Sequence, residues 1–199
     1  MKKVIVFILA FAQTIVYTQQ KQVKDNFNVR IRLEKGDLNN DGLTDKTVIT
    51  MDTIDAAVPL RLQIFLLQPN KQFKMIFSST DVIEPQYANG IHTKNTIPYF
   101  FIEKGFLVMN SEKNDVRYEH KFIYKNGVFQ LVKISSVVYD GKNSTIETVF
   151  DLLAGVRTET LKSLGSEKIL KKNVKKIMIR PLPTLQNLRN FGNKLDLER

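Results

Sequence analysis

The chain has 199 residues, of which 43% are apolar, and a formal charge of +10 at neutral pH. This length and apolar content suit one domain with a hydrophobic core. The sequence has no cysteine, which excludes disulfides, thiol catalysis and cysteine-ligated zinc.

The N-terminal residues have the anatomy of a secretory signal peptide. A positive start, Met1-Lys2-Lys3, precedes an apolar run at residues 4–17, and polar residues begin at Thr18. The run is shorter than the roughly 20 residues of a membrane-spanning helix. We therefore predict a leader at residues 1–18 and a periplasmic or secreted protein. The alternative is an uncleaved amphipathic N-terminus.

Two strand patterns flank a polar turn near the start of the predicted domain. Residues 27–33 alternate apolar and polar side chains, which predicts a strand. Residues 46–51 contain several β-branched side chains and predict a second strand. Between them lies Asp37-Leu38-Asn39-Asn40-Asp41-Gly42-Leu43-Thr44-Asp45.

This turn has the spacing by which a short loop surrounds a hard cation such as Ca²⁺. Oxygen-bearing side chains occupy its positions 1, 3, 5 and 9, and Gly42 at position 6 permits a sharp turn. The flanking strands and Val48 at position 12 exclude an EF-hand. The predicted calcium ligands are the side chains of Asp37, Asn39, Asp41 and Asp45 and the carbonyl of Leu43. The alternative is a polar turn held by side-chain-to-backbone hydrogen bonds without metal.

The residues from Gly36 to Asp45 resemble the calcium loop of FG-GAP repeats, also called VCBS-like or integrin-propeller-type repeats. Those loops carry calcium between two strands, but a propeller needs several copies and this sequence holds one. Over about residues 24–140 the chain also resembles uncharacterised exported proteins of Gram-negative bacteria. That wider likeness includes the strand from Arg61 to Leu66 and the Asn126-Gly127 hairpin, and it implies no activity.

The rest of the domain predicts antiparallel strands separated by turns about every ten residues. Strands are expected at residues 59–67, 72–77, 98–102, 106–110, 116–124, 128–139, 145–152 and 157–161. On the first of these, Leu60, Leu62, Ile64 and Leu66 share one face. Asn126-Gly127 is typical of a type I′ hairpin. Residues 78–97 form a long irregular stretch, where binding surfaces are often found. The fold class is therefore mainly β, an antiparallel meander of hairpins.

Basic charge gathers at the C-terminal end, where residues 157–199 have a net charge of +7. Within it, residues 168–180 hold six basic residues and no acid. This stretch fits either a helix with one apolar face or an edge strand guarded by lysines. Minor helical content is expected in the leader and, on the helical alternative, in this tail. We divide the chain into a leader at 1–18, a β-rich domain at 19–162 and a basic C-terminal extension at 163–199.

No catalytic motif is found in the sequence. His92 and His120 are the only histidines; we expect the first to be solvated and the second to be structural. The absence of aromatic residues among the lysines, together with the leader, argues against a nucleic-acid partner. The sequence thus predicts a calcium-stabilised binding or structural module whose partner is an envelope protein or polymer. Two alternatives stay open: docking on anionic membrane or polymer through residues 168–180, and a hydrolase without a recognisable motif.

Overall fold

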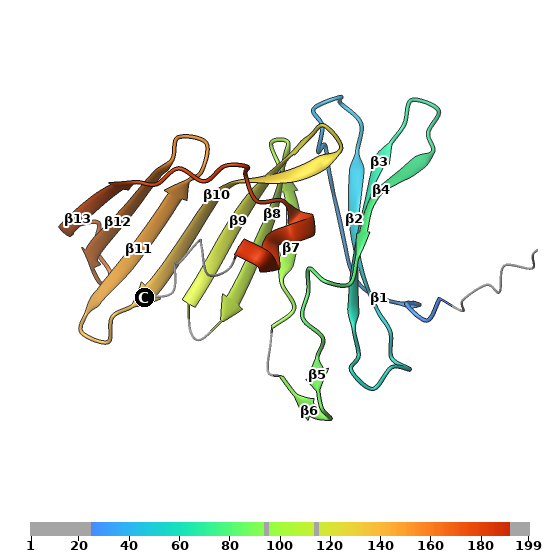
Figure 1. Cartoon of the computed structure of the whole chain (residues 1–199), viewed down its shortest axis with the longest axis horizontal. Helices are drawn as coiled ribbons and strands as arrows, with labels where there is room; N and C mark the ends of the chain where they lie inside the picture. The colour runs from blue at the N-terminus through green and yellow to red at the C-terminus, as the bar shows by residue number, and fades with distance from the viewer. Residues whose placement is uncertain (1–24, 94–95, 114–115, 192–199) are drawn as a thin grey trace, which may run out of the picture.

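The computed structural model describes residues 25–93, 96–113 and 116–191 (Figure 1). Within these ranges the chain forms two large antiparallel sheets and one small hairpin, so the predicted mainly β, antiparallel class is confirmed. The one helical element among the described residues is the 3₁₀ helix η1 (Leu185–Phe191). No helix in this part of the chain is both long enough and apolar enough to cross a bilayer. The predicted leader, with its helical content, lies outside the described residues.

The first sheet contains four strands in chain order. They are β1 (Val29–Gly36), β2 (Asp45–Met51), β3 (Leu60–Leu67) and β4 (Phe73–Ser79). Burial alternates strictly along β3, with the side chains at positions 60, 62, 64 and 66 buried. The predicted apolar face of this strand is confirmed, because alternate residues of a strand point to opposite faces.

The second sheet contains seven strands, each paired with its neighbours in the chain, so that it is a continuous meander. They are β7 (Tyr99–Glu103), β8 (Phe106–Lys113), β9 (Val116–Lys125), β10 (Val128–Tyr139), β11 (Ser144–Asp151), β12 (Val156–Ser163) and β13 (Ile169–Lys176). The β9–β10 turn has positive φ angles of 52° at Asn126 and 80° at Gly127, as the predicted type I′ hairpin requires. In the chain between β4 and β7, β5 (Tyr87–Ala88) and β6 (Ile91–His92) form a small separate hairpin.

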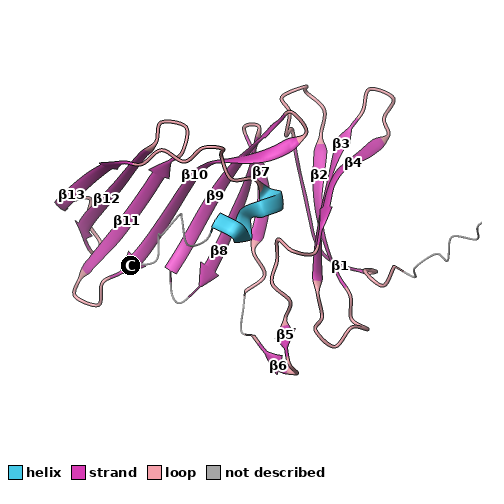
Figure 2. Ribbon diagram, in the orientation of Figure 1, coloured by secondary structure: helices cyan, strands magenta, loops and turns pink. Residues whose placement is uncertain are grey.

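One hydrophobic core joins the two sheets. The four-stranded sheet and η1 cover the same face of the seven-stranded sheet, which we call the inner face (Figures 1 and 2). Phe77 of β4 meets Phe129 of β10 edge to face, with ring centroids 6.2 Å apart, and Leu185 of η1 is fully buried in the same cluster. We call the opposite face of β7–β10 the outer face.

The basic segment is part of the second sheet. Residues 169–176 form its edge strand, paired with β12 from Val156 to Lys162, so the edge-strand alternative is confirmed and the helical one is wrong for these residues. The chain then returns over the sheet, where the Leu131 N–H donates to the Pro183 carbonyl at 2.8 Å. The predicted boundary between residues 162 and 163 falls inside β12.

Candidate functional site

The loop between β1 and β2 is held by hydrogen bonds from its side chains to its own backbone. The Asp37 carboxylate accepts the N–H groups of Asp41 (3.2 Å) and Gly42 (2.8 Å). The Asp41 carboxylate accepts the Leu43 N–H at 2.8 Å and the side-chain amide N–H of Asn39 at 2.8 Å. Gly42 has the positive φ of 81° that its predicted role requires. Three of the predicted ligand side chains therefore form one connected group at the loop tip.

Asp45, the fourth predicted side-chain ligand, is directed into the protein. It is fully buried, and its carboxylate accepts the N–H groups of Leu38 (2.8 Å) and Leu67 (2.9 Å). Burial raises the pKa of Asp45, the two backbone hydrogen bonds oppose this shift, and the nearby charges of Asp41 and Asp37 raise the pKa further. Asp45 thus ties the loop to the end of β3, and the negative charges of Asp37 and Asp41 repel that of Asp45.

The loop also contacts the second sheet, which its own sequence does not indicate. Asn40 packs on Gly105 in the β7–β8 turn so closely that a β-carbon on Gly105 would lie 2.4 Å from the Asn40 side-chain nitrogen. A β-carbon on Gly36, at the end of β1, would lie 2.7 Å from the Ile102 side chain of β7. The loop therefore sits at the seam between the two sheets.

The metal-free interpretation of the loop gains from this geometry, and the metal-bound interpretation stays a prediction. The side-chain-to-backbone hydrogen bonds of the metal-free alternative are present, and within the described residues no group of three or more His, Cys, Asp or Glu side chains is arranged to hold a metal. The donor set nevertheless consists of the carboxylate and amide oxygens that Ca²⁺ prefers. Each carboxylate oxygen also has two lone pairs, so a hydrogen bond leaves one available.

No family model, curated protein or solved structure matches the chain. The likeness of the loop to FG-GAP repeats therefore stays a prediction based on its ten residues.

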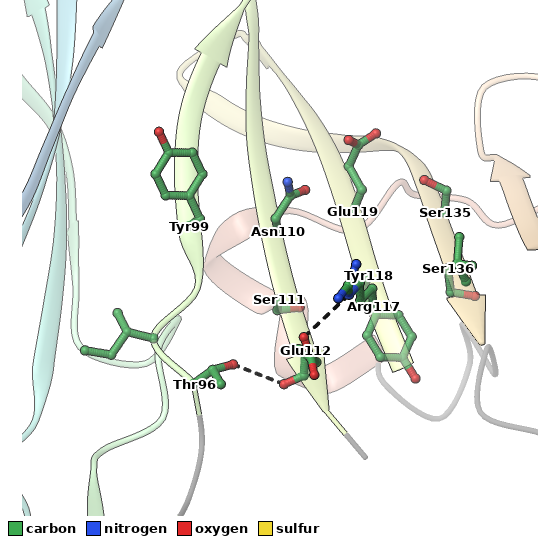
Figure 3. A pocket seen from close by; sticks show the side chains of 12 residues that line it. Thr96, Tyr99, Asn110, Ser111, Glu112, Arg117, Tyr118, Glu119, Ser135 and Ser136 are labelled. Atoms are coloured by element: carbon green, nitrogen blue, oxygen red, sulfur yellow. Dashed lines mark hydrogen bonds and ion pairs between the residues drawn. The ribbon is translucent and has the colours of Figure 1, made fainter. Parts of the chain in front are cut away.

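A second candidate site is a cavity of about 420 Å³ on the seven-stranded sheet (Figure 3). It is lined by residues of β7, β8, β9 and β10 and of the segment before β7. Tyr99, Asn110, Glu119 and Ser135 stand opposite one another on these four adjacent strands, so their side chains share one face. That face is the outer one, because Glu119 points away from the neighbouring inner-face residue His120.

Within this cavity, one buried polar atom has no partner. The side-chain oxygen Oδ1 of Asn110 is inaccessible to solvent and accepts no hydrogen bond. Most buried polar atoms in proteins are hydrogen-bonded. Of the long stretch at residues 78–97 that the sequence indicated, Thr96 and Ile97 line the cavity. The strand residues of the cavity were missed, because only the register of the strands brings them together.

The histidines lie elsewhere. The cavity lining includes neither of them, although a histidine beside a carboxylate in a pocket is what would favour the hydrolase alternative. His120 lies between Tyr118 and Phe122 on the inner face, and its Nδ1 is buried without a hydrogen-bond partner. Burial lowers the pKa of His120 to about 4. This is the structural environment expected from the aromatic neighbours of His120 in the sequence.

Proposed function

We propose that the protein is an exported, calcium-stabilised module of the cell envelope that binds an envelope protein or polymer or supports its structure. The position of the β1–β2 loop is the observation on which this proposal rests. The loop contacts the β7–β8 turn through Asn40 and the end of β3 through Asp45. An ion held there would act on the joint between the sheets as well as on one hairpin.

Electrostatic repulsion within the loop supports the proposal. Asp37 and Asp41 lie close to Asp45, and their negative charges repel that of Asp45. A divalent cation coordinated by the predicted ligands would offset this repulsion and cross-link β1, β2 and the seam. Binding to the folded state alone stabilises it by mass action. Calcium is plentiful outside the cytoplasm, where the predicted leader would direct the chain.

The test is the melting temperature of purified, metal-free protein with and without 10 mM calcium. For dissociation constants in the range of extracellular modules, about 10⁻⁴–10⁻³ M, stabilisation should be about 1.4–2.7 kcal/mol, or a rise of about 3–10 °C for a domain of this size. Asp41→Ala should abolish the rise. Asp140→Ala is the matched control, because Asp140 also accepts two backbone N–H groups in a turn. If calcium left the melting temperature of the natural chain unchanged, the proposal would be refuted.

A second candidate function is docking on an anionic polymer through β13. Lys162 on β12 is engaged by Glu147 at 2.9 Å and Glu167 at 3.0 Å. By contrast, four lysines of β13 form no ion pair within the described residues: Lys171, Lys172, Lys175 and Lys176. Strand alternation places the first and third on one face and the other two on the opposite face. A polymer running along the edge can reach all four, whereas a flat bilayer against either face meets two.

Salt-sensitive binding to polyphosphate, compared with vesicles rich in phosphatidylglycerol, tests this second candidate. Changing the four β13 lysines to Gln should abolish binding to the polymer. The control with equal charge loss changes four exposed lysines at other sites to Gln: Lys71, Lys74, Lys125 and Lys142. Equal losses in the two variants would mean that only net charge matters, and this candidate would then be rejected.

A further inference from the structure

We propose that the cavity on the outer face of β7–β10 binds a neutral, polyhydroxylated ligand, a segment of a saccharide chain. This inference rests on the proposed function for the kind of partner, an envelope polymer, but it concerns a different part of the molecule from the calcium loop. The volume of the cavity, about 420 Å³, falls in the usual range of about 300–1,000 Å³ for small-molecule sites.

A row of hydrogen-bonding groups crosses three strands in the cavity. Asn110 of β8 faces Glu119 of β9, which in turn faces Ser135 of β10. Side chains opposite one another in a sheet lie roughly 4.5–5.5 Å apart. The row offers an amide, a carboxylate and a hydroxyl, which together donate and accept hydrogen bonds. A hydroxyl also does both, so a ligand carrying several hydroxyls can engage all three groups.

The side-chain oxygen of Asn110 in this row has no hydrogen-bond partner. An amide oxygen withdrawn from solvent without a hydrogen-bond donor is unfavourable, and here it lies in the lining of a cavity open to the outside. Because this oxygen is shielded in the unbound protein, the Asn110 side chain has to rotate toward the cavity before a ligand hydroxyl can supply that donor. Tyr99, the next residue of the row, does not compete for it, because its phenol hydroxyl is hydrogen-bonded to Glu34.

The charges of the cavity favour a neutral ligand. Each carboxylate of the lining has a cation close by: Glu112 lies 3.7 Å from Arg117, and Glu119 lies 3.5 Å from Lys121. The two glutamates would repel an anionic ligand, and Arg117 would repel a cationic one. With its charges already balanced, the cavity favours hydrogen bonding over ion pairing.

Part of the cavity lining is apolar. Val137 is 43% exposed and Tyr99 is 41% exposed, and Ile97 also belongs to the lining. Arg32 covers one face of the Tyr99 ring at 4.5 Å, so the ring offers its remaining surface as a wall rather than as an open stacking platform. Sugar rings combine hydroxyl edges with C–H faces, and this cavity has a counterpart for each.

The test is calorimetric titration of the purified chain with three neutral oligosaccharides, maltotriose, cellotriose and chitotriose, and with an acidic one, trigalacturonate. We expect at least one neutral sugar to bind more tightly than the acidic sugar. Asn110→Ala and Ser135→Ala should each weaken that binding by about tenfold or more. Thr160→Ala is the control, since Thr160 is on β12 and outside the lining, and it should leave binding unchanged.

The Ser135 variant keeps the test valid if the Asn110 variant fails to fold, because removing one half-buried hydroxyl changes little volume. Absence of binding to every neutral sugar, or preference for trigalacturonate, would overturn the inference. Equal weakening by Thr160→Ala would overturn it as well. The titration is repeated with calcium and with chelator. A protein stabilised by calcium that binds no sugar refutes this inference alone, whereas sugar binding without any calcium response refutes the proposed calcium role alone.

Discussion

Asp45→Ala is expected to be among the most damaging single changes at the loop. The substitution removes the acceptor of two backbone N–H groups, those of Leu38 and Leu67. Leu38 is 1% exposed, so its N–H finds no water as a replacement. A buried donor left without a partner costs about 1–3 kcal/mol, and the Leu67 N–H is partly buried. We therefore expect a loss of about 2–4 kcal/mol in the free energy of unfolding.

The assay is urea unfolding followed by circular dichroism in calcium-free buffer, which separates the hydrogen bonds from any effect of metal. Asp140→Ala is the matched comparison, because Asp140 also accepts two backbone N–H groups, at 2.8 and 2.9 Å. The Lys142 N–H at Asp140 is exposed and the Ser144 N–H is part-buried, so water can replace part of the lost acceptor and the cost should be smaller than for Asp45, about 1–2 kcal/mol. Equal losses for the two variants would refute the reasoning that burial of Asp45 sets the magnitude.

Two further predictions concern histidine titration and the seam. Because the pKa of His120 is lowered to about 4 from 6.5, the fold favours the neutral ring; stability is full above pH 6.5 and declines as the pH falls toward 4. Between pH 7 and pH 5 the free energy of unfolding, measured by urea unfolding, should fall by about 2 kcal/mol. The His120→Phe variant should show a smaller fall. A fall of the same size in that variant would exclude His120 as its cause. Gly105→Ala should destabilise the protein by about 1–3 kcal/mol and by more than Gly127→Ala, since φ is 79° and 80° at the two sites but only Gly105 faces Asn40. Equal melting temperatures for the two glycine variants would show that the Asn40 contact contributes nothing.

Local periodicity was sufficient to predict most of the strands. The alternation from Leu60 to Leu66 marks a half-buried strand, and Asn126-Gly127 marks the type of the β9–β10 hairpin, because each signal lies within a few residues of the structure it specifies. The basic segment at residues 168–180 was ambiguous, because its apolar residues fit a helical stripe and a strand equally. Pairing with β12 decided the outcome, and pairing is a tertiary fact that the segment does not encode alone.

At the two candidate sites, too, local features could be predicted from the sequence and long-range contacts could not. The side chains of the β1–β2 loop could be named from spacing, since one short loop holds them all. The contact of Asn40 with Gly105 and the inward turn of Asp45 toward Leu67 could not, because both depend on how distant strands pack. The row of Asn110, Glu119 and Ser135 lies on three strands whose registers include a bulge between Leu131 and Lys133. A shift of one residue would move any of these side chains to the other face.

Calcium titration by isothermal calorimetry tests the central claim most directly, since it measures occupancy of the loop rather than its consequences. We predict one ion bound per chain, with a dissociation constant of about 10⁻⁴–10⁻³ M, and loss of binding in both Asp37→Ala and Asp41→Ala. Absence of calcium-dependent heat at millimolar concentrations, or binding that survives both substitutions, would contradict the account.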